Sequence, residues 1–345
     1  METEGYQGPS QGLHVRPSPP PRRRSRAWGV FKWLLVVGLA GVCIVSVVLN
    51  MVLSAGLASS GRRGQIIEEH VSGPSGFAAA AKVAVITVED IILGSEWTGS
   101  AGWIVNQLDY AMEDDEVKAV ILEIDSPGGG ITACDIVYGK IRELQSDGVT
   151  VVAFMRNIAA SGGYYISAPA DRIIAQPTTL TGSIGVMISA FNIEGLFEKI
   201  GVEAVVFKSG ENKDILSPYR PVSEEEREVL QGITDEMFER FREVVAQGRG
   251  LSDEQMEAVS DGSVFTASQA LELKLIDKIG YFADAEQVAR QASGPRTQVV
   301  RYTAPPTLAD VLFASGQAPF SRIEKRLASL TETLQPGFYY LWPGP

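Results

Sequence analysis

Residues 156–165 read Arg-Asn-Ile-Ala-Ala-Ser-Gly-Gly-Tyr-Tyr and place Ser161 between two alanines and two glycines. The apolar run from Val151 to Met155 comes before this stretch and is typical of a buried strand. Ile166 to Pro169 follows it and is consistent with a short helix. Glycines let a substrate approach the backbone closely, and a helix N-terminus offers unpaired N–H groups. The pattern suits a serine nucleophile, with a tight turn that has no chemistry as the alternative.

A second glycine-rich turn, Ile124-Asp-Ser-Pro-Gly-Gly-Gly130, also comes after an apolar run and before a helical pattern. It lacks the spacing of a phosphate-binding loop or a dinucleotide-binding fingerprint. Two such turns on neighbouring strands can direct backbone N–H groups at one developing negative charge. The pair therefore predicts an oxyanion hole, and two purely structural turns are the alternative.

The two histidines of the chain, His14 and His70, both precede Lys82, where the pattern of a globular core begins. A serine–histidine or cysteine–histidine mechanism in that core has no histidine to use. A lysine is then the natural base, and the segment Lys208-Ser-Gly-Glu-Asn-Lys213-Asp offers two. A free lysine has a pKa of about 10.4, and lowering it by about three units costs roughly 4 kcal/mol. Such a lysine must be desolvated or lie near positive charge.

Composition excludes several classes of protein. The two cysteines, Cys43 and Cys134, are too few for a disulfide framework or a structural zinc site. We therefore expect no metal, and no cofactor motif is present. The net charge of −12 argues against nucleic acid as a partner.

The N-terminal region predicts a membrane anchor. Residues 1–32 form a basic tail of disordered composition, and residues 33–53 are apolar over a length that spans a bilayer. Residues 54–81 resemble a linker. Six basic residues precede the span, which places the N-terminus in the cytoplasm and the following domain outside it. A cleaved signal peptide, with small residues at 53–58, is the alternative.

Strand and helix patterns alternate from Val83 onward, which predicts an α/β fold with a largely parallel sheet. The expected strands are 83–88, 119–124, 149–155, 172–175, 185–190 and 203–207. The expected helices are 101–112, 132–144, 266–273 and 284–292.

A longer amphipathic helix begins at a capping box formed by Ser223 and Glu226, and Gly248 and Gly250 end it. Its apolar stripe belongs to the core or to a surface between subunits. Near the C-terminus, one more amphipathic helix is expected over 320–334. The aromatic tail 338–342 then fits either a membrane-surface segment or a segment that binds the protein itself.

Four motifs occur in order, and together they carry a resemblance. They are Ser-Pro-Gly-Gly-Gly at 126–130, Ala-Ala-Ser-Gly-Gly-Tyr-Tyr at 159–165, Thr-Gly-Ser-Ile-Gly-Val at 181–186 and Lys-Ser-Gly-Glu-Asn-Lys-Asp at 208–214. From Lys82 to Ala292 the chain resembles the SppA family of signal peptide peptidases, serine–lysine proteases of the ClpP/crotonase superfamily. The resemblance implies a ClpP/crotonase-like fold of repeated β-β-α units, preceded here by one transmembrane helix. It further implies a protease domain over 82–294, which leaves 295–345 as an extension of unknown role.

The resemblance also implies roles for individual residues. Ser161 matches the nucleophile and Lys213 the general base, while Ser183 matches a serine that holds the lysine amine. The N–H groups of Gly129 and Gly162 match the oxyanion hole. Two more residues belong to these motifs: Gly128 is the near alternative to Gly129, and Lys208 is either a supporting residue or solvated.

The function implied is that of a membrane-anchored serine endopeptidase that hydrolyses released signal peptides and other unfolded apolar segments. The protein would lie in the cell (inner) membrane as a single-pass protein. Short family members form rings in which neighbouring subunits supply the serine and the lysine, so a homo-oligomer is expected, with an octamer as the suggested assembly. Two alternatives stay open: a crotonase-type acyl-CoA enzyme, and a membrane scaffold without catalysis.

The chain departs from the family pattern at two places. Leu273-Lys274-Leu275-Ile276-Asp277 stands where the family usually has Leu-Gly-Leu-Val-Asp, and Gly262-Ser263-Val264 stands where it commonly has Gly-Arg-Val. A lysine in place of a helix-ending glycine costs about 1 kcal/mol. ClpP itself uses a histidine after its serine, in a region where this chain has Val186 and Met187. The mechanism implied is therefore SppA-like.

Overall fold

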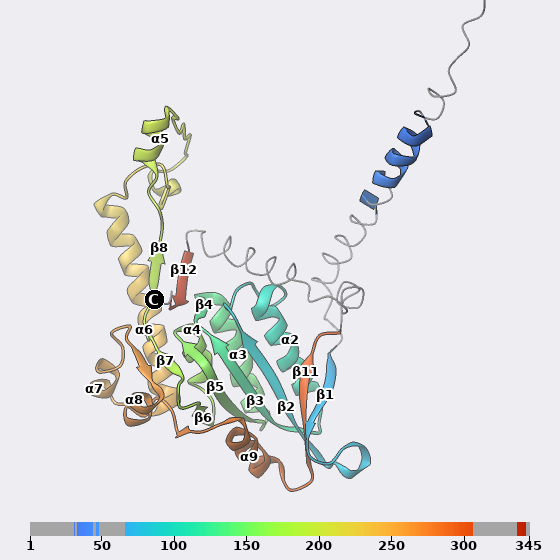
Figure 1. The fold of residues 1–345 in the computed structure, drawn as a ribbon. Coiled ribbons are helices and arrows are strands. Elements are labelled where there is room, and N and C mark those ends of the chain that lie inside the picture. The colour runs from blue at the N-terminus through green and yellow to red at the C-terminus, as the bar shows by residue number, and fades with distance from the viewer. Residues whose placement is uncertain (1–30, 32, 44–45, 48–65, 306–336, 343–345) are drawn as a thin grey trace, which may run out of the picture. The chain divides into compact units, whose positions relative to one another are not determined.

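The computed structural model describes residues 31, 33–43, 46–47, 66–305 and 337–342 (Figure 1). The chain divides into two units, Met1–Gly56 and Leu57–Pro345. In the part of the chain that is described, no helix combines the length and the apolar character that crossing a bilayer requires. The predicted membrane span lies partly outside the described residues, and the predicted helix over 320–334 lies wholly outside them.

The larger unit is built on one main sheet, with strand order β1-β11-β2-β3-β5-β6-β10. In the same sheet, β7 also pairs with β5, and β9 pairs with β7. Its strands are β1 (Ile67–Ser72), β2 (Ala81–Glu89), β3 (Val117–Ser126), β5 (Thr150–Ala160), β6 (Arg172–Ala175), β7 (Leu180–Gly182), β9 (Val264–Thr266), β10 (Lys278–Ile279) and β11 (Thr297–Thr303). All neighbours in it are parallel except β1 with β11 and β7 with β9. The predicted α/β fold with a largely parallel sheet is therefore confirmed.

Two strands of this sheet lie where the sequence analysis expects none. β1 falls in the predicted linker and β11 in the predicted C-terminal extension. They pair with each other, and β11 also pairs with β2. Since the two partners are separated by most of the chain, no local pattern signals their pairing.

A second, smaller sheet stands beside the first. It contains β4 (Gly128–Gly130), β12 (Gly337–Leu341) and β8 (Met187–Ser189) in the order β4-β12-β8. β12 is antiparallel to both neighbours. The predicted strand over 185–190 is thus shorter than expected and lies in this second sheet.

Helices cover both faces of the main sheet. The helices described in this unit, including those away from the sheet, are α2 (Gly99–Glu113), α3 (Ile131–Ser146), α4 (Gly162–Ser167), α5 (Glu194–Ile200), α6 (Glu224–Arg249), α7 (Asp253–Glu257), α8 (Ala267–Glu272) and α9 (Phe282–Ser293), with 3-10 turns η1 (Gly76–Ala78) and η2 (Glu211–Asp214). Alternate residues of the strands face opposite ways, as the strand period requires. Ala84 and Ile86 join the core that contains α2, α3 and α4, whereas Val83 and Val85 pack in the core that contains α9.

The long helix α6 carries the capping box that the sequence predicts. The Ser223 hydroxyl accepts from the Glu226 N–H, and the Glu226 carboxylate accepts from the Ser223 N–H. Gly250, with φ 62°, ends the helix. Only the C-terminal half of its apolar stripe is buried, through Phe241, Val244 and Val245. The N-terminal half of the helix lies in a part of the molecule where few apolar side chains are buried.

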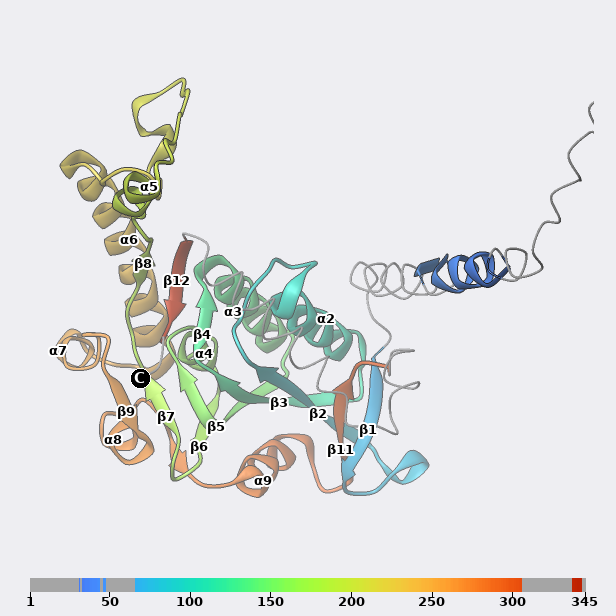
Figure 2. The same ribbon diagram turned by 45° about the horizontal axis from the view of Figure 1, so that its top comes forward.

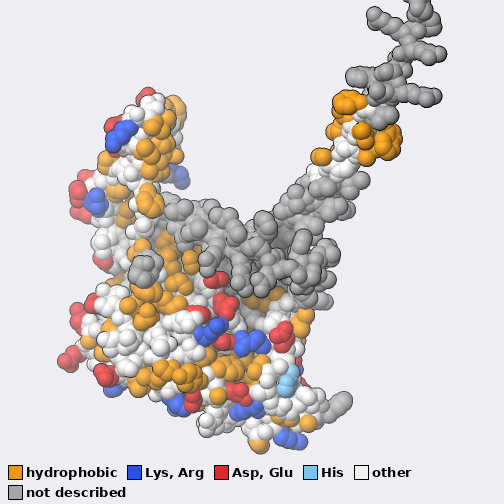
Figure 3. Space-filling model, in the orientation of Figure 1, with side chains coloured by type: hydrophobic (Ala, Val, Ile, Leu, Met, Phe, Trp, Pro, Cys, Tyr) orange, Lys and Arg blue, Asp and Glu red, His pale blue; other side chains and the backbone are white. Residues whose placement is uncertain are grey.

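That part is an arm, formed by β8, α5, η2 and the first turns of α6, which extends away from the sheet (Figures 1 and 2). Its surface is rich in hydrophobic side chains (Figure 3). Those exposed between residues 191 and 207 are Phe191, Leu196, Ile200, Val202, Val205, Val206 and Phe207. The predicted strand over 203–207 is wrong: these residues have no regular structure, and Phe207 is 95% exposed. Among the described residues, no strand pairs with residues 203–207.

Candidate active site

Ser161 is the single residue between β5 and α4. The strand is longer than predicted and the helix begins directly after the serine, so the turn between them is sharp. Ser161 has φ 51° and ψ −114°, which non-glycine residues rarely adopt, and only 1% of it is exposed. Its N–H donates to the Gly182 carbonyl oxygen at 2.8 Å. A strained, well-fixed serine at the end of a central strand is a common arrangement for a nucleophile.

The turn at 126–130 is fixed by its own serine. The Ser126 hydroxyl donates to the Asp90 carbonyl oxygen at 2.6 Å and accepts from the Gly128 N–H at 3.1 Å. Gly128 has φ 106° and so needs to be glycine. A side chain at Gly129 would overlap with the backbone of Ile92, with which β4 forms a bridge. This role of Ser126 was not predicted, although its place beside the glycines was a usable signal.

The two glycine turns lie in contact. A Cβ placed on Gly162 would be 3.0 Å from the Gly129 nitrogen, and one placed on Gly128 would be 2.6 Å from the Gly162 nitrogen. The same Cβ on Gly162 would be 2.5 Å from the sulfur of Cys134. Only glycines allow this approach, which brings the two predicted oxyanion amides to one place. Burial raises the pKa of the Cys134 thiol, which makes it a poor nucleophile.

Ser183 lies beside Ser161 because β5 and β7 are paired. Ala160 is the register partner of Gly182, so the next residue of each strand leaves the sheet at the same point. Ser183 has φ 51° as well, and 7% of it is exposed. Its N–H donates to the Ser263 carbonyl oxygen at 2.7 Å, a backbone bond that does not depend on which side chain stands at 263.

Lys213 is not part of this cluster. It lies in η2, in the arm segment between α5 and α6, which both ribbon views place away from α4 (Figures 1 and 2). Its side chain is exposed, and no hydrogen bond or ion pair joins it to another described residue. Within one chain the structure thus brings Ser161, Ser183, Gly129 and Gly162 together and leaves Lys213 apart.

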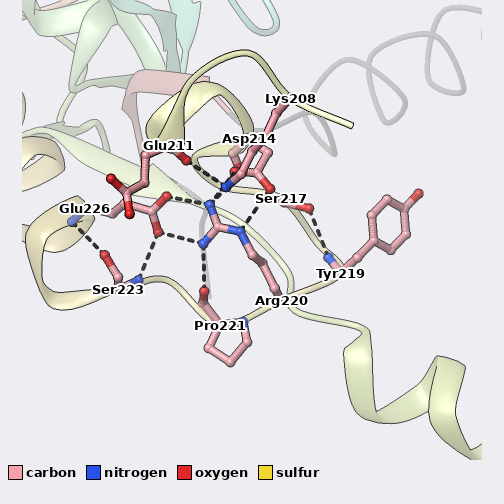
Figure 4. A network of polar contacts seen from close by, with 9 residues as sticks. All are labelled: Lys208, Glu211, Asp214, Ser217, Tyr219, Arg220, Pro221, Ser223 and Glu226. Carbon is pink, nitrogen blue, oxygen red and sulfur yellow. Dashed lines mark hydrogen bonds and ion pairs between the residues drawn. The ribbon is translucent and has the colours of Figure 1, made fainter. Parts of the chain in front are cut away.

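An ion-pair network holds the η2 turn (Figure 4). The Arg220 guanidinium donates to the Asp214 carboxylate at 2.6 Å and to the Glu226 carboxylate at 2.5 and 2.8 Å. Lys208 donates to the Asp214 carboxylate at 2.8 Å and to the Glu211 carbonyl oxygen at 2.7 Å. Lys208 therefore bonds to both Glu211 and Asp214, the first and last residues of η2, the turn that contains Lys213.

The network also fixes the charges of its carboxylates. The hydrogen bonds from Arg220 and Lys208 hold the pKa of Asp214 well below its usual range. The hydrogen bonds from Arg220 and from the Ser223 N–H lower the pKa of Glu226 to about 2. Both carboxylates are therefore charged at neutral pH, and they anchor η2 to the start of α6.

The C-terminal strand β12 contacts the same site. Tyr340 is the register partner of Gly129, and the Trp342 N–H donates to the Pro127 carbonyl oxygen at 2.9 Å. The Tyr340 ring is fully buried. Of the two roles expected for this tail, membrane binding and self-binding, the structure shows self-binding.

Two family models match the chain. The model of Peptidase family S49 covers residues 143–295, which include Ser161, Ser183 and Lys213, and the model of Clp protease covers residues 80–181. The segment 143–295 is thus similar to peptidase family S49. Proteins named as a signal peptide peptidase and as a protease are also similar to this chain.

The chain is 42% identical over 181 residues to a putative signal peptide peptidase SppA of Enterococcus faecium, covering 52% of this chain and 53% of that protein. It is 43% identical over 183 residues to a putative protease of Synechocystis, covering 53% of this chain and 66% of that one. Protease 4 of Haemophilus influenzae is 36% identical over 231 residues, which cover 66% of this chain and 36% of that protein. The chain thus spans about half to two thirds of the length of the first two relatives.

Proposed function

We propose that this chain is a serine endopeptidase in which Ser161 is the nucleophile and the N–H groups of Gly129 and Gly162 form the oxyanion hole. The contact between the two glycine turns beside a strained, buried serine carries this proposal. Donors fixed in place before the reaction stabilise a developing oxyanion without reorganisation, and losing one typically costs a factor of about 10²–10³ in rate.

In the proposed reaction, a neutral lysine amine removes the proton of the Ser161 hydroxyl, and the oxygen attacks a peptide carbonyl carbon. The two glycine amides bind the oxyanion. The lysine ammonium then protonates the leaving amine, and water hydrolyses the acyl-enzyme. Lys213 is the proposed base, and Ser183, next to the nucleophile, is positioned to hold its amine.

The lysine would come from a neighbouring subunit. Ser161 lies in the body of a chain and Lys213 on its arm, where the exposed apolar residues offer a surface for another copy. A contact of this kind also desolvates a lysine, which favours the neutral amine that a base requires. A head-to-tail contact repeated around a closed ring gives every subunit one complete site.

The proposed substrates are released signal peptides and other unfolded apolar segments. The proposed location is the cell (inner) membrane, with the apolar segment 33–53 as a single-pass anchor, the basic tail in the cytoplasm and the peptidase unit outside it. We also propose a homo-oligomer, for which an octamer fits the family resemblance, and no cofactor or metal.

The experiment that tests the site uses the purified full chain with casein and a synthetic signal peptide as substrates. Ser161→Ala and Lys213→Ala should each abolish hydrolysis, whereas Lys208→Ala should keep a measurable rate. Activity that persists in Lys213→Ala and disappears in Lys208→Ala would assign the base to Lys208. A wild-type oligomer that cleaves none of these substrates would contradict the proposed activity.

Mixed oligomers test the shared site. Co-expressed Ser161→Ala and Lys213→Ala chains should regain activity, because some contacts join an intact serine to an intact lysine. In a ring of head-to-tail contacts, random mixing gives about a quarter of the sites both groups. Activity that stays at zero in verified mixed oligomers would place both groups in one chain.

A further inference from the structure

Lys213 stands among carboxylates, yet its amine pairs with none of them. Glu211 lies two residues before it in η2, and Asp214 follows it directly. Glu226, in the first turn of α6, is joined to Asp214 through Arg220. Lys213 is exposed, and neither a hydrogen bond nor an ion pair joins its side chain to any residue that the structure describes. Because a nearby carboxylate favours the charged form of an amine, this freedom suits a residue that must act as a base.

The Arg220 guanidinium engages every one of its N–H groups at this turn (Figure 4). Nε donates to Asp214 Oδ2 at 3.0 Å, and Nη2 donates to Asp214 Oδ1 at 2.6 Å. Nη1 and Nη2 donate to the two carboxylate oxygens of Glu226, and Nη1 also donates to the Pro221 carbonyl oxygen at 3.0 Å. The donors of a guanidinium lie in one fixed plane, so a single side chain holds both carboxylates.

Lys208 completes the hold on Asp214. Its amine donates to Asp214 Oδ1 at 2.8 Å, the oxygen that Arg220 Nη2 also contacts. Both carboxylate oxygens of Asp214 therefore have a cationic partner. The two cations balance the charges of Asp214 and Glu226, which leaves this cluster of four side chains without net charge. Asp214 thus offers little attraction to the Lys213 amine beside it.

The backbone that follows Lys213 is fixed as well. The Ser217 N–H donates to the Asp214 carbonyl oxygen at 2.9 Å, and Arg220 Nη2 donates to the same oxygen at 3.3 Å. Leu216 has φ 60°, which a non-glycine residue rarely adopts. Such a conformation persists only where the surrounding contacts determine it. Asp214 is therefore held by its side chain and its backbone, while the side chain of Lys213 is left free.

We propose that Arg220, together with Lys208, is a positioning residue for Lys213, because it occupies the neighbouring carboxylates and keeps them from pairing with the lysine amine. The amine is then free to enter the site of a neighbouring subunit in its neutral form. Without Arg220, Asp214 would form an ion pair with Lys213 that favours the charged amine and holds it on its own chain. This inference rests on the proposed function and deepens it, since it names the residues that keep the base available.

The other ionisable groups of this part of the chain are not contacted by Arg220. They are Glu211 of η2, Glu224, Glu225 and Arg227 of α6, Tyr219 before α6, and Glu194, Glu198 and Lys199 of α5. None of them has an ion pair with Lys213 among the described residues. All are exposed except Glu194, which is half-buried. Solvent and salt screen such charges, so they provide matched controls for the two carboxylates that Arg220 holds.

The first test measures the Lys213 amine directly and needs no catalysis. The full chain with Ser161→Ala is treated with acetic anhydride, which reacts with neutral amines, over a range of pH, and peptide mass spectrometry follows each lysine. Adding Arg220→Gln should raise the pH at which Lys213 reaches half its maximal rate of acetylation by about 0.5 unit. Lys199, exposed on the same arm, should not change. An unchanged midpoint at Lys213 would overturn the inference.

A double variant separates the ion pair from a general loss of structure. Arg220→Gln with Asp214→Asn lacks both the guanidinium and the carboxylate next to Lys213, while Glu226 is still held by the Ser223 N–H. The acetylation midpoint should return to the value measured with Arg220 intact. A midpoint that stays raised would show a structural effect alone and would overturn the inference. Glu211→Gln added to Arg220→Gln is the control and should leave the midpoint raised.

The pH dependence of kcat/KM on the synthetic signal peptide connects the pair to catalysis. The acidic limb of the profile should move to higher pH by about 0.5 unit in Arg220→Gln and return in the double variant. Lys208→Gln leaves the guanidinium in place and should give a smaller shift of the same sign. A loss of activity that is equal at every pH would overturn the inference. Acetylation that behaves as described in a protein that cleaves nothing would fail the proposed function alone.

Discussion

The backbone N–H of Ser161 donates a 2.8 Å hydrogen bond to the carbonyl oxygen of Gly182, and both residues have positive φ angles, 51° and 84°. This bond fixes the candidate nucleophile to the neighbouring strand, next to Ser183. A serine in such a conformation costs of order 1–3 kcal/mol, which the surrounding sheet must offset. The strain at Ser161 is open to direct measurement.

Ser161→Gly should be more stable than Ser161→Ala by about 1 kcal/mol, because glycine adopts positive φ without strain. Both variants should be inactive. Urea unfolding of the two proteins measures the difference. At Ser167, inside α4, the order should reverse, since glycine is worse than alanine within a helix. Equal stabilities of Ser161→Gly and Ser161→Ala would refute the strain.

Lys274→Gly should stabilise the protein by about 0.5–1 kcal/mol. Lys274 is exposed and has φ 61°, just beyond the end of α8, where the family usually has glycine. Its carbonyl oxygen accepts from Arg249 at 3.1 Å, and glycine keeps that bond. Thermal unfolding measures the gain. Glu272→Gly, at the last residue of the helix, is the control and should not stabilise the protein.

Glu226→Gln should destabilise the protein at neutral pH, and the loss should depend on pH. Arg220 lowers the pKa of Glu226 to about 2, whereas an unfolded glutamate titrates near about 4.3. The stabilisation is therefore complete above the unfolded value and is lost as the pH falls towards 2. Melting temperatures of wild type and variant should differ at pH 7 and converge near pH 2.

The matched control for that experiment is Glu228→Gln, because Glu228 is exposed on the same helix and has no ion pair among the described residues. Its effect on the melting temperature should be small and should change little between pH 7 and pH 2. A Glu226→Gln effect that is the same at both pH values would show that the Arg220 contact does not stabilise the fold.

Gly129→Ala should reduce the rate of peptide hydrolysis by about 10² or more, because the methyl group would displace β4 from Ile92 and move an oxyanion donor. Circular dichroism and the oligomer mass should show whether the fold survives. Gly139→Ala is the control, since Gly139 lies in α3 with open space around it. That change should keep full activity and stabilise the helix by about 0.5–1 kcal/mol. Full activity in Gly129→Ala would exclude this amide from catalysis.

Local signals in the sequence predicted local structure well. The capping box of Ser223 and Glu226 is present, and Lys274 has the left-handed conformation that its motif implied. Such features depend on residues a few positions apart. The same holds for the alternation of apolar strands with amphipathic helices, which predicted the largely parallel sheet.

Long-range pairing could not be predicted in this way. The run 203–207 has strong β propensity, yet a strand needs a partner edge, and a single chain gives it none among the described residues. Conversely, β1 has a weak local pattern, and both β1 and β12 pair with strands that lie far from them in the sequence. The position of Tyr340 at the glycine turns followed from no motif.

The arm has a consequence for when the protein can act. Because Ser161 lies in the body and Lys213 on the arm, a chain that has met no other copy would have no working pair. The exposed apolar residues of the arm would then be the same ones that complete the site when copies meet. A newly made molecule would be harmless to other proteins, and the local density of copies would decide where proteolysis begins.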